Sequence, residues 1–392
     1  MKRIAILFNG NLEDRKGFIN AVFERTKKLY ARKTYSIDIF CLSQYDYWLI
    51  RQLRHTQKTD KPSMVEIDSL PINLIWYPFS LIDYLLDTKF HVGKLVEPII
   101  IKRIISRFRH YDLISAHSLV PGGLAYEIFK RYKTPYCITW HGSDIHTEPF
   151  ANKGVFRKVF EIMSKASLNM FVSQALQQTA NKINPNIKSA VLYNAASEIF
   201  YRIDEKRRAE LRRQHKSTNG KVVAFAGGLV PIKNADILPN IFASIQNISD
   251  EKIEFWIIGD GKLRDIIERK LASMPNVHCK LWGNQPVEKM PELLNCVDVL
   301  ILPSKNEGLP LIVVEALKSG ANVVASDVGG IKEVLGNDNV IEIGNNFIER
   351  FSTKVITILN SNSQTPQIPE QFDWQMTCDA ENEIYIRILN EK

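Results

Sequence analysis

The sequence contains no uninterrupted apolar run of about 18 residues, the length that an α-helix needs to cross a bilayer. The N-terminal stretch MKRIAILFNGNLED has too short an apolar segment for a secretory signal peptide, so we expect the chain to begin directly with a strand. The few cysteines are odd in number, scattered and without metal-ligand spacing: Cys41, Cys137, Cys279, Cys296 and Cys378. They favour reduced core residues in a cytoplasmic protein.

A complete dinucleotide-binding fingerprint is also missing. Residues 253–259 are typical of a buried strand, and Asp260 and Gly261 lead from it into a helix. A nicotinamide site would need a third glycine here and an acidic residue at the end of the next strand, and neither is present. We therefore interpret this segment as a structural turn, expect no cofactor, and find little support for an oxidoreductase.

The length of 392 residues suits two domains of about 200 residues each. The charge is uneven: residues 1–200 hold 28 Lys and Arg against 17 Asp and Glu, whereas residues 201–392 hold 23 against 26. The basic first half favours a membrane surface or a phosphate-bearing acceptor as its partner. Charge alone does not exclude nucleic acid, which we do not expect.

Residues 91–109 form a basic segment, HVGKLVEPIIIKRIISRFR. As a helix it would have an apolar face surrounded by cations, which fits an anionic lipid surface. A helix packed on the core with a basic solvent face explains the pattern equally well, and Pro98 predicts a break or a kink.

Alternating strand and helix patterns run through both halves. Strands at 2–8 and 35–42 flank a helix at 18–31, and a second strand-loop-helix series begins at 221–226. This order predicts an α/β fold of two doubly wound parallel sheets. The charged segment 204–216 is interpreted as a solvated helix that precedes a linker, which puts the boundary between the domains near residue 200.

The most informative stretch is VDVLILPSKNEGLPLIVVEALKSGANVVASDVGG, residues 297–330. It predicts a buried strand at 297–302, a polar loop that contains Glu307, and a helix at 311–318 that contains Glu315. A lone glutamate is usually a solvated charge. Glu315, however, lies in an apolar helix, where a carboxylate is costly unless it meets a polar ligand or partner, and open α/β sheets bind ligands at this edge.

Two histidines follow neighbouring predicted strands in the first half. His117 ends the strand at 112–117, and His141 follows the strand at 135–140 directly. A single histidine in such a place is more often structural. Because both would lie at the carboxyl edge of one sheet, the pair favours a functional role.

With Gly308, Leu309 and Pro310, the spaced glutamates resemble the double-glutamate motif of the retaining glycosyltransferases of family 4. That family has the GT-B fold, in which two doubly wound Rossmann-like domains face each other across a cleft. The resemblance implies that Glu307 and the backbone of residues 308–311, through Leu311, hold the donor sugar. It implies that Glu315 binds the ribose of the nucleotide.

The segment YCITWHGSDI is similar to the family's N-terminal domain, where the histidine contacts the donor sugar. The resemblance assigns that role to His141 and makes His117 and Asp144 cleft residues. In VLYNAAS, Asn194 matches the family and is a further cleft residue, whereas Ala195 stands where the family has glycine.

The glycine loop at residues 227–233 follows a predicted strand and can bring backbone close to a phosphate. It resembles the family's diphosphate loop, which normally has an arginine after the first glycine, Gly227, and a lysine five residues beyond that arginine. Lys233 matches, but Gly228 occupies the arginine position. The resemblance also implies base contacts from Gly283 and Asn284.

The resemblance divides the chain into an acceptor-binding domain at 1–200, a nucleotide-sugar-binding domain at 201–371 and a helix at 372–392 that crosses back to the first domain. No Asp-x-Asp pair, the metal site of many glycosyltransferases, is present, so we expect no metal. Charge stabilisation would then come from Lys233 and helix N-terminal amides.

These patterns predict a hexosyltransferase that moves a sugar from a nucleotide-diphosphate donor to a saccharide or lipid-linked saccharide, in cell-surface polysaccharide synthesis. Its catalytic residues would be Glu307, His141 and Lys233. We expect it in the cytoplasm, peripherally at the inner face of the membrane. The alternative is a non-catalytic nucleotide-sugar-binding subunit of a glycosyltransferase complex, which would tolerate Gly228.

Overall fold

The protein is represented by a computed structural model, which describes residues 1–12, 17–46, 48–54, 60–79, 102–215, 220–361 and 366–391. The chain forms two compact units. Unit 1 consists of Met1–Tyr193 and Trp374–Lys392, and unit 2 of Asn194–Asp373.

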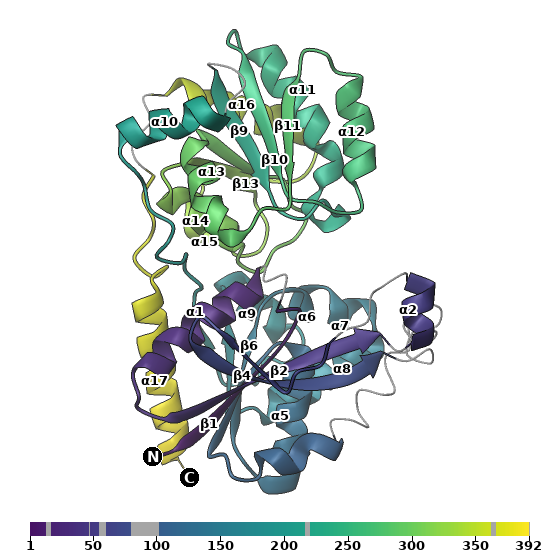
Figure 1. Ribbon diagram of the computed structural model, residues 1–392, viewed down its shortest axis with the longest axis vertical. Helices are drawn as coiled ribbons and strands as arrows, with labels where there is room; N and C mark the ends of the chain where they lie inside the picture. Colours follow the sequence, from purple (N-terminus) through teal and green to yellow (C-terminus); the bar gives the residue numbers. More distant parts are fainter. Residues whose placement is uncertain are drawn as a thin grey trace. The chain divides into compact units, whose positions relative to one another are not determined.

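Unit 1 contains one sheet of eight strands in the described ranges (Figure 1). Its strands, in spatial order, are β3 (Met64–Ile67), β4 (Leu70–Phe79), β2 (Ser36–Asp46), β1 (Arg3–Asn9), β5 (Leu113–His117), β6 (Tyr136–Trp140), β7 (Leu168–Phe171) and β8 (Ser189–Val191). All neighbours pair in parallel except β3 and β4. The strand order reverses between β1 and β5, which is the mark of a doubly wound sheet.

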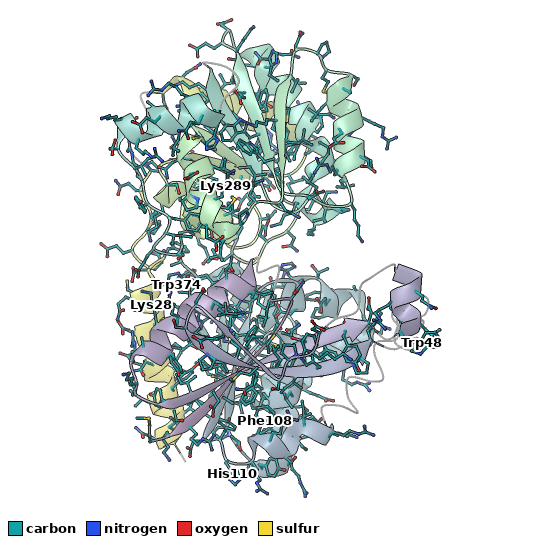
Figure 2. All side chains as sticks on the ribbon, in the orientation of Figure 1. Lys28, Trp48, Phe108, His110, Lys289 and Trp374 are labelled. Carbon is teal, nitrogen blue, oxygen red and sulfur yellow. The ribbon has the colours of Figure 1, made fainter. Side chains whose placement is uncertain are left out.

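The helices of unit 1 are α1 (Phe18–Ala31), α2 (Trp48–Arg54), η2 (Ile105–Phe108), α5 (Leu119–Tyr132), α6 (Ser143–His146), α7 (Glu148–Ala151), α8 (Lys153–Lys165), α9 (Gln174–Asn181) and α17 (Trp374–Asn390). Of the predicted basic helix, residues 91–101 lie outside the described ranges. Phe108, labelled in Figure 2, is fully buried and packs edge-on against Phe40 of β2, with ring centroids 4.9 Å apart.

A hairpin at the edge of this sheet was not predicted. β3 and β4 pair antiparallel through a turn in which Asp68 and Ser69 have φ angles of 50° and 62°. Positive φ at both central residues matches the right-handed twist of the flanking strands. Neither residue is a glycine, so the sequence carries no strong turn signal, whereas residues 73–78, most of β4, do have the apolar character of a strand.

A buried ion pair joins α17 to α1, which lie alongside each other in Figure 1. Arg25 donates from Nε and Nη2 to Glu381 Oε2, at 3.0 and 2.9 Å, and both side chains are 1% exposed. Tyr385 then donates to Glu381 Oε1 at 2.7 Å and lies 2.8 Å from Ser115 Oγ of β5. This network connects the C-terminal helix to the strand that carries His117.

Unit 2 contains a parallel sheet of six strands in the described ranges. In spatial order they are β11 (His278–Gly283), β10 (Ile253–Ile258), β9 (Lys221–Ala226), β12 (Val299–Leu302), β13 (Asn322–Ser326) and β14 (Val340–Ile341). The helices are α10 (Glu205–His215), η3 (Pro231–Lys233), η4 (Ala235–Ile237), α11 (Leu238–Ile248), α12 (Arg264–Ala272), η5 (Val287–Lys289), α13 (Met290–Cys296), α14 (Leu311–Lys318), α15 (Ile331–Leu335) and α16 (Phe347–Asn360).

The central strands of unit 2 are buried along their whole length, as their continuous apolar sequences predict. β10, IEFWII, includes one charged residue, Glu254, and its carboxylate accepts a hydrogen bond from Trp256 Nε1 at 2.7 Å. This bond gives the buried Trp256 indole N–H an acceptor.

The charged helix α10 is less solvated than its sequence indicates. Leu211 is buried, and Arg208 and Arg212 both pair with Asp298 at the start of β12. Asp298 also accepts a hydrogen bond from the backbone of Val222 at 2.7 Å. The helix therefore attaches to the sheet through partly buried charge pairs, which a count of charges along the chain does not reveal.

Both units are doubly wound, Rossmann-like α/β sheets, so the predicted fold class is confirmed. The roles assigned to residues 1–200, 201–371 and 372–392 stay predictions. None of the helices in the described ranges combines the length and the apolar character needed to cross a bilayer.

We expect Glu381→Gln to lower the free energy of unfolding of unit 1 by about 3 to 5 kcal/mol, because it leaves the Arg25 guanidinium buried without a counter-charge. Urea denaturation of the full chain measures the change. Glu127→Gln, in the exposed pair with Lys130, is the matched control and should cost less than about 1 kcal/mol. A double variant, Arg25→Met with Glu381→Met, should recover much of the loss, and a double variant as unstable as Glu381→Gln would contradict this interpretation.

Candidate functional site

The site in unit 2 lies where the strand order of the sheet reverses. β9 has β10 on one side and β12 on the other, and the chain winds outwards in both directions from this pair. The loops that follow β9 and β12 therefore diverge at the carboxyl edge, where doubly wound sheets bind ligands. These two loops are the predicted glycine loop and the predicted Glu307 loop.

The glycine loop is held by backbone contacts with the loop that follows β10. Gly227 N donates to Ile258 O at 2.9 Å, and Leu229 N donates to Asp260 O at 3.0 Å. Gly259 has φ +133°, and a Cβ there would collide with the carbonyl of Gly227. The Gly259 to Gly261 segment therefore supports the glycine loop, which agrees with its interpretation as a structural turn.

Lys233 and Glu307 meet at this edge. Lys233 Nζ lies 2.6 Å from Glu307 Oε1, and Ser304 Oγ donates to the same oxygen at 2.7 Å. The Glu307 side chain is 9% exposed and that of Lys233 is 25% exposed. The predicted diphosphate cation and the predicted sugar-binding carboxylate thus form one ion pair. Nothing in the sequence indicated that Ser304 also hydrogen-bonds to this carboxylate.

The Glu307 loop is shaped by the segment after β13. Gly329 has φ +55°, and a Cβ there would collide with the Glu307 carbonyl. Gly330 N donates to Gly308 O at 2.9 Å, and Lys305 N donates to Ile232 O at 2.8 Å. Gly329 and Gly330 lie in the predicted central stretch, but only the fold shows that they support Glu307.

Glu315 lies on α14, which begins at Leu311 directly after Pro310. Its side chain is partly buried, and no hydrogen bond to its carboxylate is found within the described residues. Burial raises the pKa of Glu315 from its usual value near 4.5 to about 7. A partly buried carboxylate without a donor is suited to accept hydrogen bonds from a ligand's hydroxyl groups.

The remaining predicted donor residues differ in their surroundings. Leu309 is buried at 6% exposure, whereas Asn284 is exposed. Gly283 ends β11 with φ +64° and accepts a hydrogen bond from Gly259 N at 2.8 Å. Gly228 does not have positive φ, and a Cβ there would meet only Val230 Cγ2, at 3.8 Å.

In unit 1, the structure brings the two histidines together. His117 Nδ1 lies 3.2 Å from His141 Nε2, and the rings stack with centroids 5.5 Å apart. The other nitrogen of His141, Nδ1, is buried without a hydrogen-bond partner in the described part of the chain. Phe18 packs against the His141 ring at 5.0 Å and was not predicted.

Both imidazoles are held in the neutral form. Burial lowers the pKa of His141 to about 3, and the nearby Arg25 cation adds to this effect. Burial, Arg25 and His141 hold the pKa of His117 well below its ordinary value. A neutral imidazole can donate one hydrogen bond and accept another, as a polar ligand such as a sugar hydroxyl requires.

Asp144 and Asn194 are buried. Asp144 accepts from the backbone amides of Gly142, at 2.9 Å, and of His141, and burial raises its pKa to about 7. These bonds shape the turn that positions His141. Asn194 Oδ1 has no hydrogen-bond partner within the described ranges. The ligand contacts predicted for the two residues stay predictions.

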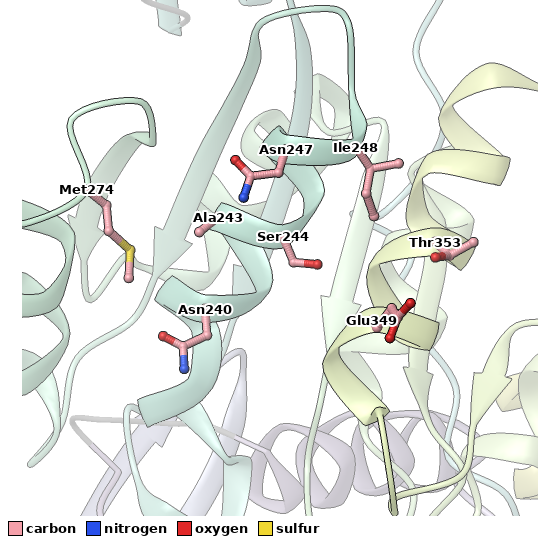
Figure 3. Close-up of a pocket in the computed structure, with 8 residues that line it drawn as sticks. All are labelled: Asn240, Ala243, Ser244, Asn247, Ile248, Met274, Glu349 and Thr353. Atoms are coloured by element: carbon pink, nitrogen blue, oxygen red, sulfur yellow. The ribbon is translucent and has the colours of Figure 1, made fainter.

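Two other features of the described residues bear on ligands. No group of three His, Cys, Asp or Glu side chains there is arranged to hold a metal ion. A groove on unit 2 runs between α11 and α16, with Asn240, Ser244 and Thr353 among its lining residues (Figure 3). None of the predicted site residues lines this groove.

Comparisons with known families cover most of the chain. Residues 84–197 match the family model of Glycosyltransferase Family 4, and residues 207–372 match that of Glycosyl transferases group 1.

Among curated proteins, the teichuronic acid biosynthesis glycosyltransferase TuaC of Bacillus subtilis, a putative assignment, is 29% identical over 60% of this chain and 58% of its own length. The GPI3 subunit of a phosphatidylinositol N-acetylglucosaminyltransferase from Saccharomyces cerevisiae is 27% identical over 53% of this chain and 47% of its own. The matches thus span about half the length of these relatives.

Among solved structures, HepE from Anabaena in complex with UDP-glucose superimposes with a TM-score of 0.72 and 18% identity, over 98% of this chain and 99% of that one. At this identity the likeness shows the fold.

The raised pKa of Glu315 predicts a pH-dependent loss of stability. Between pH 4.5 and about 7 the folded chain keeps a proton that the unfolded chain releases, so the associated stability is full below pH 4.5 and is lost as the pH rises through about 7. The free energy of unfolding of Glu315→Gln, relative to that of wild type, should therefore be higher at pH 8 than at pH 5 by roughly 1 to 3 kcal/mol. Urea denaturation at both pH values measures this. The exposed Glu349→Gln controls for the loss of one carboxylate, and an equal gain in both variants would contradict the prediction.

Proposed function

Because the chain belongs to the family 4 glycosyltransferases of the GT-B fold, we propose that it transfers a hexose-type sugar from a nucleotide-diphosphate donor with retention of configuration. The main support for the proposal is the Lys233–Glu307 ion pair, which lies where the strand order of the unit 2 sheet reverses.

The ion pair supplies the two kinds of group that a nucleotide-diphosphate sugar requires. The Lys233 ammonium is the cation of the glycine loop and offsets charge that develops on the departing diphosphate. Glu307 accepts hydrogen bonds from sugar hydroxyls and is already oriented by Ser304. In the free protein each charge neutralises the other, so the partly buried lysine and carboxylate are stable before the donor binds.

Glu315 and His141 add further polar contacts: burial raises the pKa of Glu315 to about 7, and His141 is neutral. The unpartnered carboxyl group of Glu315 suits a ribose hydroxyl pair, and donation by those hydroxyls favours its ionised form. The neutral His141 imidazole, with Nδ1 unpaired, suits a sugar hydroxyl. We propose no protein nucleophile.

The donor and acceptor follow from chemistry and from relatives. HepE was solved with UDP-glucose, which favours a uridine diphosphate sugar as the first donor to test. The basic first half and the named activities of TuaC and GPI3 favour a lipid-linked or phosphate-bearing saccharide acceptor. We propose that the transfer is metal-independent and takes place at the cytoplasmic side of a membrane, in the synthesis of a surface polysaccharide.

A non-catalytic sugar-nucleotide-binding subunit is the second candidate. Gly228 stands where the family normally has an arginine, so the diphosphate loop contributes one cation instead of two. One of the relatives, GPI3, is itself a subunit of a transferase. Such a subunit would bind the nucleotide sugar without turning it over.

We expect Glu307→Ala and Lys233→Ala each to lower turnover at least tenfold, since each removes half of the ion pair and leaves the other charge partly buried and unpaired. The assay follows release of UDP from radiolabelled UDP-sugars in EDTA, with GDP- and ADP-sugars in parallel. Lys305→Ala is the matched control, because this exposed side chain lies in the same loop. Unchanged turnover in Glu307→Ala would remove that residue from the site, and tight donor binding with no turnover in wild type would favour the subunit.

Gly228→Arg should restore the second cation. The position does not have positive φ and has open space around the missing Cβ, so the loop can keep its conformation. A charge-assisted hydrogen bond to the diphosphate should tighten UDP binding about tenfold. Isothermal titration calorimetry measures the change, with Gly228→Ala as the control for loss of glycine. An arginine variant that binds UDP no better than the alanine variant would contradict the assignment of this loop to the diphosphate.

A further inference from the structure

Three phenylalanines, one of them only partly exposed, lie on α7 and α8 of unit 1; we call this group the aromatic ridge. Phe150, on α7, is 53% exposed, and Phe160, on α8, is 42% exposed. Phe156 lies between them: its ring is 6.3 Å from that of Phe150, edge to face, and it precedes Phe160 by four residues on the same helix. Single exposed apolar residues are ordinary on protein surfaces, whereas two exposed phenylalanines with a third between them on the same two helices form a larger apolar patch.

The ridge does not belong to the face of α8 that packs on the core. Val159, Ile162 and Met163 are buried, and the helix packs against α5 through that side. Phe160 is three residues before Met163 in sequence but lies on the exposed side with Lys153 and Arg157. The helix therefore has enough apolar contact without Phe160, and packing within unit 1 does not account for this aromatic residue.

Cations accompany the ridge. Lys153 and Arg157 are exposed and lie one turn apart, on the same side of α8 as Phe160, and Lys165 is exposed at the end of the helix. Two acidic residues are near. Glu148 accepts a hydrogen bond from Ser143 at 3.1 Å, and Glu161 lies beside Arg157 on the exposed side. The balance over α7 and α8 is positive, since Lys158 adds a fourth basic residue.

The ridge also follows the site histidine closely along the chain. His141 leads into α6, α6 contacts α7, and α7 contacts α8. Asn152 begins α8 by accepting from the amides of Gly154 and Val155, at 2.8 and 3.2 Å, which defines the direction of the helix from the α7 turn. A membrane or other surface to which α7 and α8 bind would therefore lie next to the part of unit 1 that positions His141.

We propose that the aromatic ridge of Phe150, Phe156 and Phe160, with Lys153 and Arg157 beside it, docks the protein on an anionic lipid surface. Aromatic side chains insert at the boundary between headgroups and acyl chains, while neighbouring cations pair with anionic headgroups. The inference extends the proposed function, because it supplies the surface on which a lipid-linked acceptor would be met. It concerns residues outside the segment 91–109, on which the sequence-based membrane prediction rests.

The first experiment is co-sedimentation of the full chain with vesicles of phosphatidylglycerol and phosphatidylcholine, compared with phosphatidylcholine alone. Wild type should partition onto the anionic vesicles, and Phe150→Ser with Phe160→Ser should lower the partition coefficient at least tenfold. Ile386→Ser is the matched control: Ile386 is 43% exposed in the same unit, on α17, and its loss should leave binding unchanged.

The second experiment separates the ridge from net charge. Lys153→Glu with Arg157→Glu should lower binding about tenfold or more and weaken its salt dependence. Lys182→Glu with Lys188→Glu changes the net charge of unit 1 equally, at exposed lysines outside α7 and α8, and should lower binding much less. Equal losses in the two double variants would show that only the overall charge matters and would overturn the ridge assignment.

The third experiment reports insertion directly. Phe160→Trp should show a blue shift of its added fluorescence on anionic vesicles and quenching by brominated acyl chains, whereas Ile386→Trp should show neither. An unquenched Phe160→Trp would overturn the proposal. A second result would also overturn it: wild type forms a dimer in solution, Phe160→Ser dissociates that dimer, and wild type does not bind vesicles. The ridge would then join two copies of the chain.

UDP-sugar binding is measured on every variant by thermal shift. A ridge variant that loses vesicle binding but keeps nucleotide binding supports the ridge assignment independently of the site in unit 2. Absence of nucleotide binding in wild type would contradict the proposed function and would leave the vesicle results unaffected.

Discussion

The ion pair between Lys233 and Glu307 is the interaction on which the site in unit 2 depends. It connects the loops that follow two adjacent parallel strands, and it forms because the strand order reverses between β9 and β12. Close backbone contacts at Gly259 and Gly329 hold the two loops in place. The pair keeps a cation and a carboxylate partly buried before any ligand is present, so a donor that binds both needs little rearrangement of the protein.

Unit 1 holds its polar groups differently. A full ion pair, Arg25 with Glu381, is buried between α1 and α17, and its positive member also acts on the two histidines nearby. Burial and this cation together keep His117 and His141 neutral. The two units thus offer complementary chemistry: opposite charges in one, and neutral hydrogen-bonding rings in the other. In the proposed transfer a charged diphosphate leaves an uncharged sugar, so each kind of group suits one of these two parts of the donor.

The surface of unit 1 extends this description from the donor to the acceptor. Its basic composition is a property of the sequence, but the aromatic ridge on α7 and α8 arises because α8 buries its other side against α5. A membrane-bound acceptor is met in two dimensions, so a docking surface raises its local concentration without further contacts at the site.

Much of the fold could be predicted because it depends on local periodicity. The strand at 221–226 and the helices at 18–31 and 311–318 begin and end where their apolar patterns and terminating residues indicate. The β3 hairpin was missed because its turn uses Asp68 and Ser69 in place of glycine. Residue types and spacing within one segment also pointed to Glu307, Glu315 and Lys233 as candidates. Which of them touch depends on contacts between distant segments. The Lys233–Glu307 pair, the Arg25–Glu381 pair across 356 residues and the stacked histidines were decided by the tertiary structure. Side chains so far apart in sequence meet only when the strands, helices and loops that carry them pack together.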